Sequence, residues 1–308
     1  MPDLPDPGPF LVRLMKAVAP EKGAELERQV SELRITFEID ENQDRIHFSA
    51  DNIHRKIIVG MRCLGRLWAN AFAYFCIYTD VADMKVRAIT ARELDLRSSE
   101  RLRKAGDLLN WATNADVKIK LSQRLGIDTG DLGLPPDLPV PFSEAEFASD
   151  KHVADELSLM ALGFILHHER EHIELGHTSS EGFVSIEQEK AADMRAAAWL
   201  LDSPGIGDDA LLKRQLGIAV GLGWLASLNV YIVQPGNATH PPGYDRVFQV
   251  LEQYVEDDNS PAWAFTMTLL SLHLQNQQEP IPLEYDREFT SFRDAANYYI
   301  DVISWLGK

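Results

Sequence analysis

The stretch LSLMALGFILHHEREHIELGH (residues 157–177) joins an almost continuously apolar run to a cluster of four histidines. The apolar residues indicate a helix that enters the protein core, and we expect this helix to run from about Val153 to Gly176. The histidines and acidic residues that follow would then be partly buried. Burying such groups without partners is costly, and a bound metal ion would offset that cost.

The sequence HEREH (168–172) within this stretch has the H-E-x-x-H pattern of zinc hydrolases. Residues four apart lie on one face of a helix, so the imidazoles of His168 and His172 can reach the same ion. Glu169 is placed to act as general base for the attacking water without being a ligand. Two imidazoles with a carboxylate suit Zn2+ best. A solvated, histidine-rich helix face is the alternative interpretation.

A third ligand is expected from the E-x-x-x-D sequence at 189–193, in a helix that begins at the capping-box sequence SIEQ (185–188). Glu189 is the preferred ligand, and Glu187 is the alternative. Asp193, one turn further along, could accept a hydrogen bond from the second nitrogen of a ligand histidine and so fix its tautomer. His177 follows His168 by nine residues and is interpreted as a helix-terminus residue, not as a ligand.

The segment THPPGYDR (239–246) is a third candidate element of the site. His240 directly precedes a Pro-Pro helix start and is therefore a candidate catalytic residue that stabilises the oxyanion of a tetrahedral intermediate. Tyr231 is a second candidate for this role. An ordinary turn histidine beside a helix start is the competing interpretation. Arg246 is expected to pair with an acid in the cleft.

Composition limits the classes of function. The chain has 308 residues, 45% of them apolar, and a net charge of −17, which argues against a nucleic-acid-binding surface. The N-terminal sequence lacks a signal-peptide pattern, so a cytoplasmic location is expected. Cys63 and Cys76 are expected to be buried free thiols. The uncharged stretch 216–233 is predicted to be a core helix in preference to a membrane span.

The predicted fold class is mainly α (α+β), with a zincin-like helical metallopeptidase core and a small N-terminal β element. Alternating residues in 33–49 predict a hairpin that turns at 41–44, followed by a buried helix over 57–81. We predict an N-terminal region over 1–145 and a helical peptidase region over 146–308. The Gly- and Pro-rich segment 126–142 marks the boundary and is a candidate cover for the cleft. Other helices are expected near 10–18, 91–120, 185–202, 211–233, 241–255, 262–275 and 291–305.

The sequences HEREHIELGH, EKAAD and THPPGYDR, in this order, resemble the gluzincin metallopeptidases, in which H-E-x-x-H precedes E-x-x-x-D and a later H-P-x-x-x-x-R. Membrane-bound CAAX prenyl proteases share this order, and so do the Lit-like phage-exclusion peptidases. The Lit-like family is the closer match because this chain lacks a convincing set of membrane spans. The resemblance covers roughly residues 157–255. It implies zinc ligation by His168, His172 and Glu189, with Glu169 as general base and Asp193 in support.

The predicted function is a cytoplasmic zinc-dependent endopeptidase that acts in phage defence. The resemblance to Lit-like members implies a protein substrate, for which elongation factor Tu is the candidate. Neither nucleic acid nor a membrane is an expected partner. One alternative is a peptidase-like regulatory or partner-binding protein with a structural metal site. A second alternative is a membrane-embedded peptidase.

Overall fold

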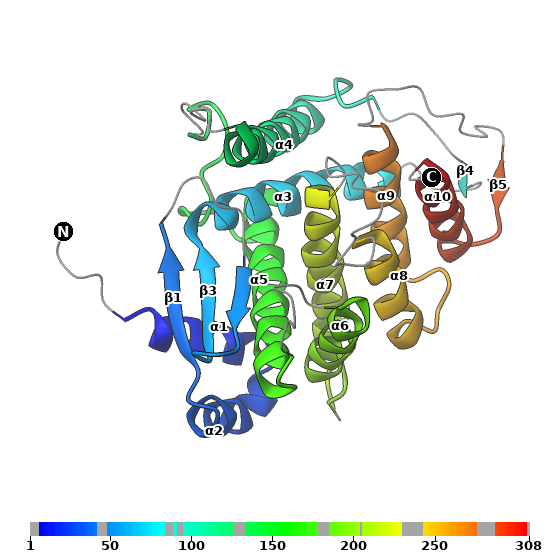
Figure 1. Cartoon of the computed structure of the whole chain (residues 1–308). Helices are drawn as coiled ribbons and strands as arrows, with labels where there is room; N and C mark the ends of the chain where they lie inside the picture. The colour runs from blue at the N-terminus through cyan, green and yellow to red at the C-terminus, as the bar shows by residue number, and fades with distance from the viewer. Residues whose placement is uncertain are drawn as a thin grey trace.

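The computed structural model describes residues 6–41, 48–83, 89–90, 95–125, 133–177, 185–203, 205–229, 243–275 and 287–306. It is mainly helical with a small three-stranded sheet near the N-terminus, which confirms the prediction of a mainly α chain with a small N-terminal β element. The sheet lies at one side of the molecule, α5 runs beside it, and α8, α9 and α10 lie on the opposite side (Figure 1).

The sheet has the strand order β1-β3-β2, in which β1 is Thr36–Asp40, β2 is Phe48–Asp51 and β3 is Lys56–Gly60. The predicted hairpin between the first two strands is wrong. β3 lies between them, parallel to β1 and antiparallel to β2. The reason is that β3 carries the buried β-branched pair Ile57 and Val59, which suits a central strand.

The helix predicted from residue 57 begins later, because residues 56–60 form β3. Helix α3 is Met61–Asp83, and its buried face includes Trp68 and Phe72. Both Cys63 and Cys76 in this helix are buried thiols that form no disulfide, as predicted.

Helix α5, Asp150–Glu174, packs against α1, α3, α6 and α7. Its N-cap is Ser149, whose side chain accepts a hydrogen bond from the backbone N–H of His152. Helix α6, Ile186–Leu201, begins with the predicted capping box between Ser185 and Gln188. Helix α7, Asp208–Asn229, approaches α5 closely at Gly217, where an added Cβ would lie 2.3 Å from the Cβ of Met160.

The remaining elements surround this centre. Helix α4 lies against α3, and α10 packs on α9 (Figure 1). The short strands β4 and β5 pair antiparallel. The bounds of these elements are Gly8–Val18 for α1, Pro20–Lys22 for the 3-10 helix η1, Gly23–Glu32 for α2, Ile89–Thr90 for β4, Glu100–Leu125 for α4, Gly243–Tyr254 for α8, Pro261–Gln275 for α9, Glu288–Phe289 for β5 and Phe292–Leu306 for α10.

Within the described residues, the structure contains no helix that is long and apolar enough to cross a membrane. The described part of the uncharged stretch belongs to α7, where Trp224 is fully buried, as predicted for a core helix. The N-terminal and peptidase regions divided at residue 145 stay a prediction.

The described part of the predicted cleft cover, residues 133–142, lies away from the histidines. The indole N–H of Trp111 donates to the carbonyl of Gly133, and the backbone N–H of Phe142 donates to Asp155 near the start of α5. Asp155 precedes His168 by thirteen residues, which is about 20 Å along a helix. This part of the segment therefore does not cover the site.

Candidate metal centre

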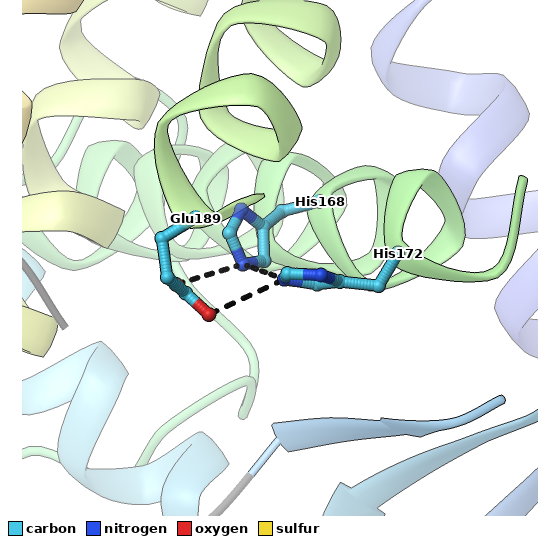
Figure 2. A group of neighbouring side chains, drawn as sticks. All are labelled: His168, His172 and Glu189. Atoms are coloured by element: carbon cyan, nitrogen blue, oxygen red, sulfur yellow. Dashed lines mark hydrogen bonds and ion pairs between the residues drawn. The ribbon is translucent and has the colours of Figure 1, made fainter. Parts of the chain in front are cut away.

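Three buried side chains converge between α5 and α6. The Nε2 atoms of His168 and His172 lie 3.0 Å apart. Two oxygens of the Glu189 carboxylate lie 3.6 Å and 3.5 Å from these nitrogens (Figure 2). The three side chains could hold one metal ion. The structure thus brings together all three residues that the sequence predicted as ligands.

The two helices explain this convergence. His168 and His172 stand one turn apart on α5, so their rings lie above one another on one face. On α6, Ala192 and Ala196 are fully buried, and such small side chains allow the two helices to approach closely. Because the capping box sets the start of α6, Glu189 lies in its first turn and points toward the histidines (Figure 2).

Asp193 and Arg246 contact the ligand residues, Asp193 at His168 and Arg246 at Glu189. Asp193 Oδ1 lies 2.9 Å from His168 Nδ1, the nitrogen that faces away from His172. The guanidinium of Arg246 donates to both Asp193 oxygens at 2.6 and 2.7 Å and lies 3.4 Å from Glu189. Burial opposes charge on Asp193, but the cation of Arg246 and His168 hold its pKa below the usual value. Asp193 therefore remains anionic and can keep the His168 proton on Nδ1.

The pKa values of the two histidines move in opposite directions. Burial lowers the pKa of His172 to about 3, and the positive form of His168 adds to this effect, so His172 is neutral near pH 7. Burial acts against the charged form of His168 as well, but the Asp193 carboxylate outweighs it and raises the pKa. A metal ion would compete with that proton for Nε2.

Glu169 lies beside this cluster and is 8% exposed. Burial raises its pKa to about 7, and the negative charge of Glu189 contributes in the same direction. The positive charges of His168 and Arg246 and a hydrogen bond from the backbone N–H of Ala50 on β2 act against that rise. A carboxyl group with a pKa near 7 can both accept and donate a proton at neutral pH.

Arg170 and Glu171, the two variable positions of H-E-x-x-H, connect α5 to its neighbours α6 and α2. The buried guanidinium of Arg170 lies over the ring of Trp199 on α6, 4.1 Å from its centroid, and contacts Glu171. Glu171 in turn pairs with Arg195 of α6 at 2.6 Å, and Arg170 donates to Gln29 of α2 at 2.9 Å. These contacts set the distance between the helix that carries the histidines and the one that carries Glu189.

His177 lies just past the C-terminal end of α5 and outside the ligand set, as predicted, but its contact with a ligand histidine was not predicted. It is buried, and its Nδ1 lies 2.9 Å from Nδ1 of His172. The signal was present in the sequence as Gly176, because a glycine just past a helix end turns the chain back over the last turn.

Other predicted residues lie elsewhere. Glu187, the alternative ligand, has an 84% exposed side chain and lies 3.7 Å from Lys190, so it does not join the group. His240 and Tyr231 lie outside the described residues. Arg246 pairs with two acids of the site, as predicted.

The ligand set fits a zinc ion. Zinc bonds of about 2.0–2.1 Å in a tetrahedral site separate neighbouring ligand atoms by roughly 3.3 Å. The nitrogen and oxygen atoms here are separated by 3.0, 3.5 and 3.6 Å. Two imidazoles and one carboxylate also leave the fourth position of such a site open. The buried nitrogens and carboxylate oxygens of this group could therefore hold one metal ion.

The chain is similar to known peptidases over most of its length. The chain is 28% identical over 240 residues to the cell death peptidase of Escherichia coli (strain K12), a match that covers 77% of each chain. No solved structure matches. The family model described as Peptidase U49 matches residues 57–266, which include all but the first residue of β3, the whole of α5 and α6, and every residue of the ligand set. The chain therefore belongs to the Peptidase U49 family.

Proposed function

We propose that this protein is a zinc-dependent endopeptidase that cleaves a cytoplasmic protein. The observation that carries the proposal is the convergence of His168, His172 and Glu189, with the buried acid Glu169 beside them. Membership of a peptidase family supports the class of reaction. By resemblance to the Lit-like members, the proposed setting is phage defence and the first substrate to test is elongation factor Tu.

Each residue has a distinct proposed role. His168, His172 and Glu189 hold the ion, and Asp193 orients His168 through its Nδ1. Zinc, when bound, supplies a Lewis acid that makes water nucleophilic at neutral pH. Glu169 removes a proton from the attacking water and delivers it to the leaving nitrogen of the peptide. Burial raises its pKa to about 7 in the metal-free protein, and the positive charge of a bound zinc ion would lower that pKa and favour the carboxylate that accepts the proton.

The sheet provides a place for an extended substrate. Among the strands that the structure describes, β2 is an outer one, paired with β3 on one side. The backbone N–H of Ala50 in β2 reaches Glu169, so the other side of β2 faces the site. A peptide that added to this side as a further strand would carry its carbonyl groups past Glu169. A protein segment in extended form is therefore the proposed substrate class.

Metal analysis of the purified protein tests the first step. We expect about one zinc per chain in the wild type, none in a His168→Ala, His172→Ala double variant, and full zinc in Glu169→Gln. Elongation factor Tu incubated with each protein then tests cleavage, which only the wild type should perform. Bound zinc without cleavage of any offered protein would favour a structural metal site and a regulatory role. Absence of zinc from the wild type, even after zinc is supplied, would overturn the proposal.

A further inference from the structure

The end of helix α5 folds His177 back onto His172. Gly176 has a φ of +61°, the left-handed conformation that glycine adopts readily. Its N–H donates to the carbonyl of Ile173 at 3.2 Å, and the N–H of His177 donates to the carbonyl of His172 at 3.0 Å. This pair of bonds is the Schellman motif, in which the second residue past the helix contacts a residue of its last turn. At the end of α5 these two residues are His177 and His172.

The imidazole rings of His172 and His177 contact each other through their Nδ1 atoms. Nδ1 of His177 lies 2.9 Å from Nδ1 of His172, with ring centroids 5.0 Å apart and planes at 67°. The opposite nitrogen of His172, Nε2, faces His168 at 3.0 Å and Glu189 at 3.5 Å. His172 thus uses one nitrogen toward the ligand set and the other toward His177.

This arrangement selects one tautomer of His172. A neutral imidazole carries a single proton, and the nitrogen that binds a metal must be the one without it. When Nε2 of His172 offers its lone pair to an ion, the proton resides on Nδ1 and can be donated to Nδ1 of His177. His177 then carries its own proton on Nε2. Asp193 does the same for His168 at 2.9 Å, so each ligand histidine has its own acceptor.

The sheet holds His177 in place. The side-chain amide of Asn52, in the turn between β2 and β3, donates a hydrogen bond to the backbone carbonyl of His177. His177 is 9% exposed, and this hydrogen bond is partly buried. The neighbouring side chain in the turn, Ile53, is 87% exposed. The turn thus connects the sheet to the ligand histidine through two successive contacts.

We propose that His177 is a positioning residue that fixes the tautomer and ring orientation of His172 for metal binding, and that Asn52 anchors it. This inference rests on the proposed zinc site. His177 does not join the ligand atoms, because its contact is with the nitrogen of His172 that points away from His168.

Zinc affinity, measured by competition with a chromophoric chelator, tests the proposal. His177→Phe retains the ring shape but removes the acceptor, and it should weaken zinc binding about tenfold to hundredfold. His177→Asn places an amide oxygen near the position of Nδ1 and should restore most of the affinity. Asn52→Ala should weaken binding in the same direction, whereas the matched turn variant Ile53→Ala should leave it unchanged. Circular dichroism and thermal unfolding of the metal-free variants show whether each is folded.

Nitrogen NMR of 15N-histidine-labelled, zinc-loaded protein provides a readout that a merely structural role would not move. We expect His172 to be protonated at Nδ1 in the wild type and in His177→Asn, with that proton exchanging faster with solvent in His177→Phe. Equal zinc affinity for the wild type and a folded His177→Phe variant would overturn the inference and leave the proposed function standing. A wild type that binds no zinc would overturn both.

Discussion

Arg246 and Asp193 form a bidentate ion pair inside the protein, with nitrogen–oxygen distances of 2.6 and 2.7 Å and exposed fractions of 5% and 2%. The pair joins α8 to α6, and through His168 it reaches α5 as well. One buried carboxylate therefore connects three helices at the candidate metal centre. The arrangement has consequences for stability that can be measured.

Removing the positive charge of Arg246 should destabilise the folded protein. Arg246→Met leaves the carboxylates of Asp193 and Glu189 buried without their arginine, and we expect the free energy of unfolding to fall by about 3–5 kcal/mol. Arg293→Met is the matched control, since Arg293 pairs with Glu252 and Asp258 where both acids are 52% exposed. That change should cost about 1 kcal/mol or less. Urea unfolding of the metal-free proteins measures both, and equal losses would contradict the assigned burial.

Glu169 should make the metal-free protein less stable as the pH rises. Its folded pKa of about 7 exceeds its ordinary value of 4.5, so the folded state holds more protons than the unfolded state between these values. Stability from this group is complete below about pH 4.5 and declines up to about pH 7. Glu169→Gln does not titrate and should become more stable than the wild type by roughly 3 kcal/mol at pH 8.

Urea unfolding at pH 5 and pH 8, with zinc removed from both proteins, measures this effect. The stability difference between Glu169→Gln and the wild type should be small at pH 5 and large at pH 8. A difference that is the same at both pH values would mean that Glu169 keeps an ordinary pKa in the folded protein.

Zinc should stabilise the folded state, because the ligand set is assembled only when α5 and α6 pack together. At a free zinc concentration 1,000 times the dissociation constant, we expect a gain of about 4 kcal/mol. Removal of zinc with a chelator should reverse the gain. The melting temperature, measured with and without zinc, reports it. A Glu189→Gln variant should gain far less, and a gain equal to that of the wild type would exclude Glu189 as a ligand.

The close approach of α5 and α7 requires glycine at position 217 of α7, because glycine has no Cβ. A Cβ at Gly217 would lie 2.3 Å from the Cβ of Met160 and 3.2 Å from its backbone carbon. Because both contacts are close to the backbone of α5, the two helices would have to move apart. Gly217→Ala should lower the free energy of unfolding by about 1–3 kcal/mol. Gly207→Ala is the control, because a Cβ there meets nothing within 4 Å. Thermal or urea unfolding distinguishes the two, and equal stability of the variants would contradict the helix spacing.

Local patterns in the sequence predicted the helical elements well. The apolar run before the histidines indicated α5, and the capping-box sequence located the start of α6 at Ser185. Both patterns involve residues only a few positions apart, so they can be recognised without knowledge of the fold. The spacing of His168 and His172 belongs to the same class, since a single helix turn brings them together.

Strand pairing could not be predicted in this way. The alternation in 33–49 indicated strands, but the partner of β1 is β3, which follows β2 in the chain. Period-two patterns show which face of a strand is buried and carry no information about its neighbour. The same limit applies to Glu169, whose contact with Ala50 requires the sheet to dock beside α5.

The sequence by itself determined the helices, their caps and the residue types that could bind a metal, because these follow from interactions within a turn or two of chain. The tertiary structure decided the contacts around them, such as the bidentate pairing of Arg246 with Asp193 and the hydrogen bond from Asn52 to His177. Arg246 lies 53 residues from Asp193, and Asn52 lies 125 residues from His177. Such pairs form only after packing has removed water and brought distant segments within hydrogen-bonding distance, and no local pattern encodes that step.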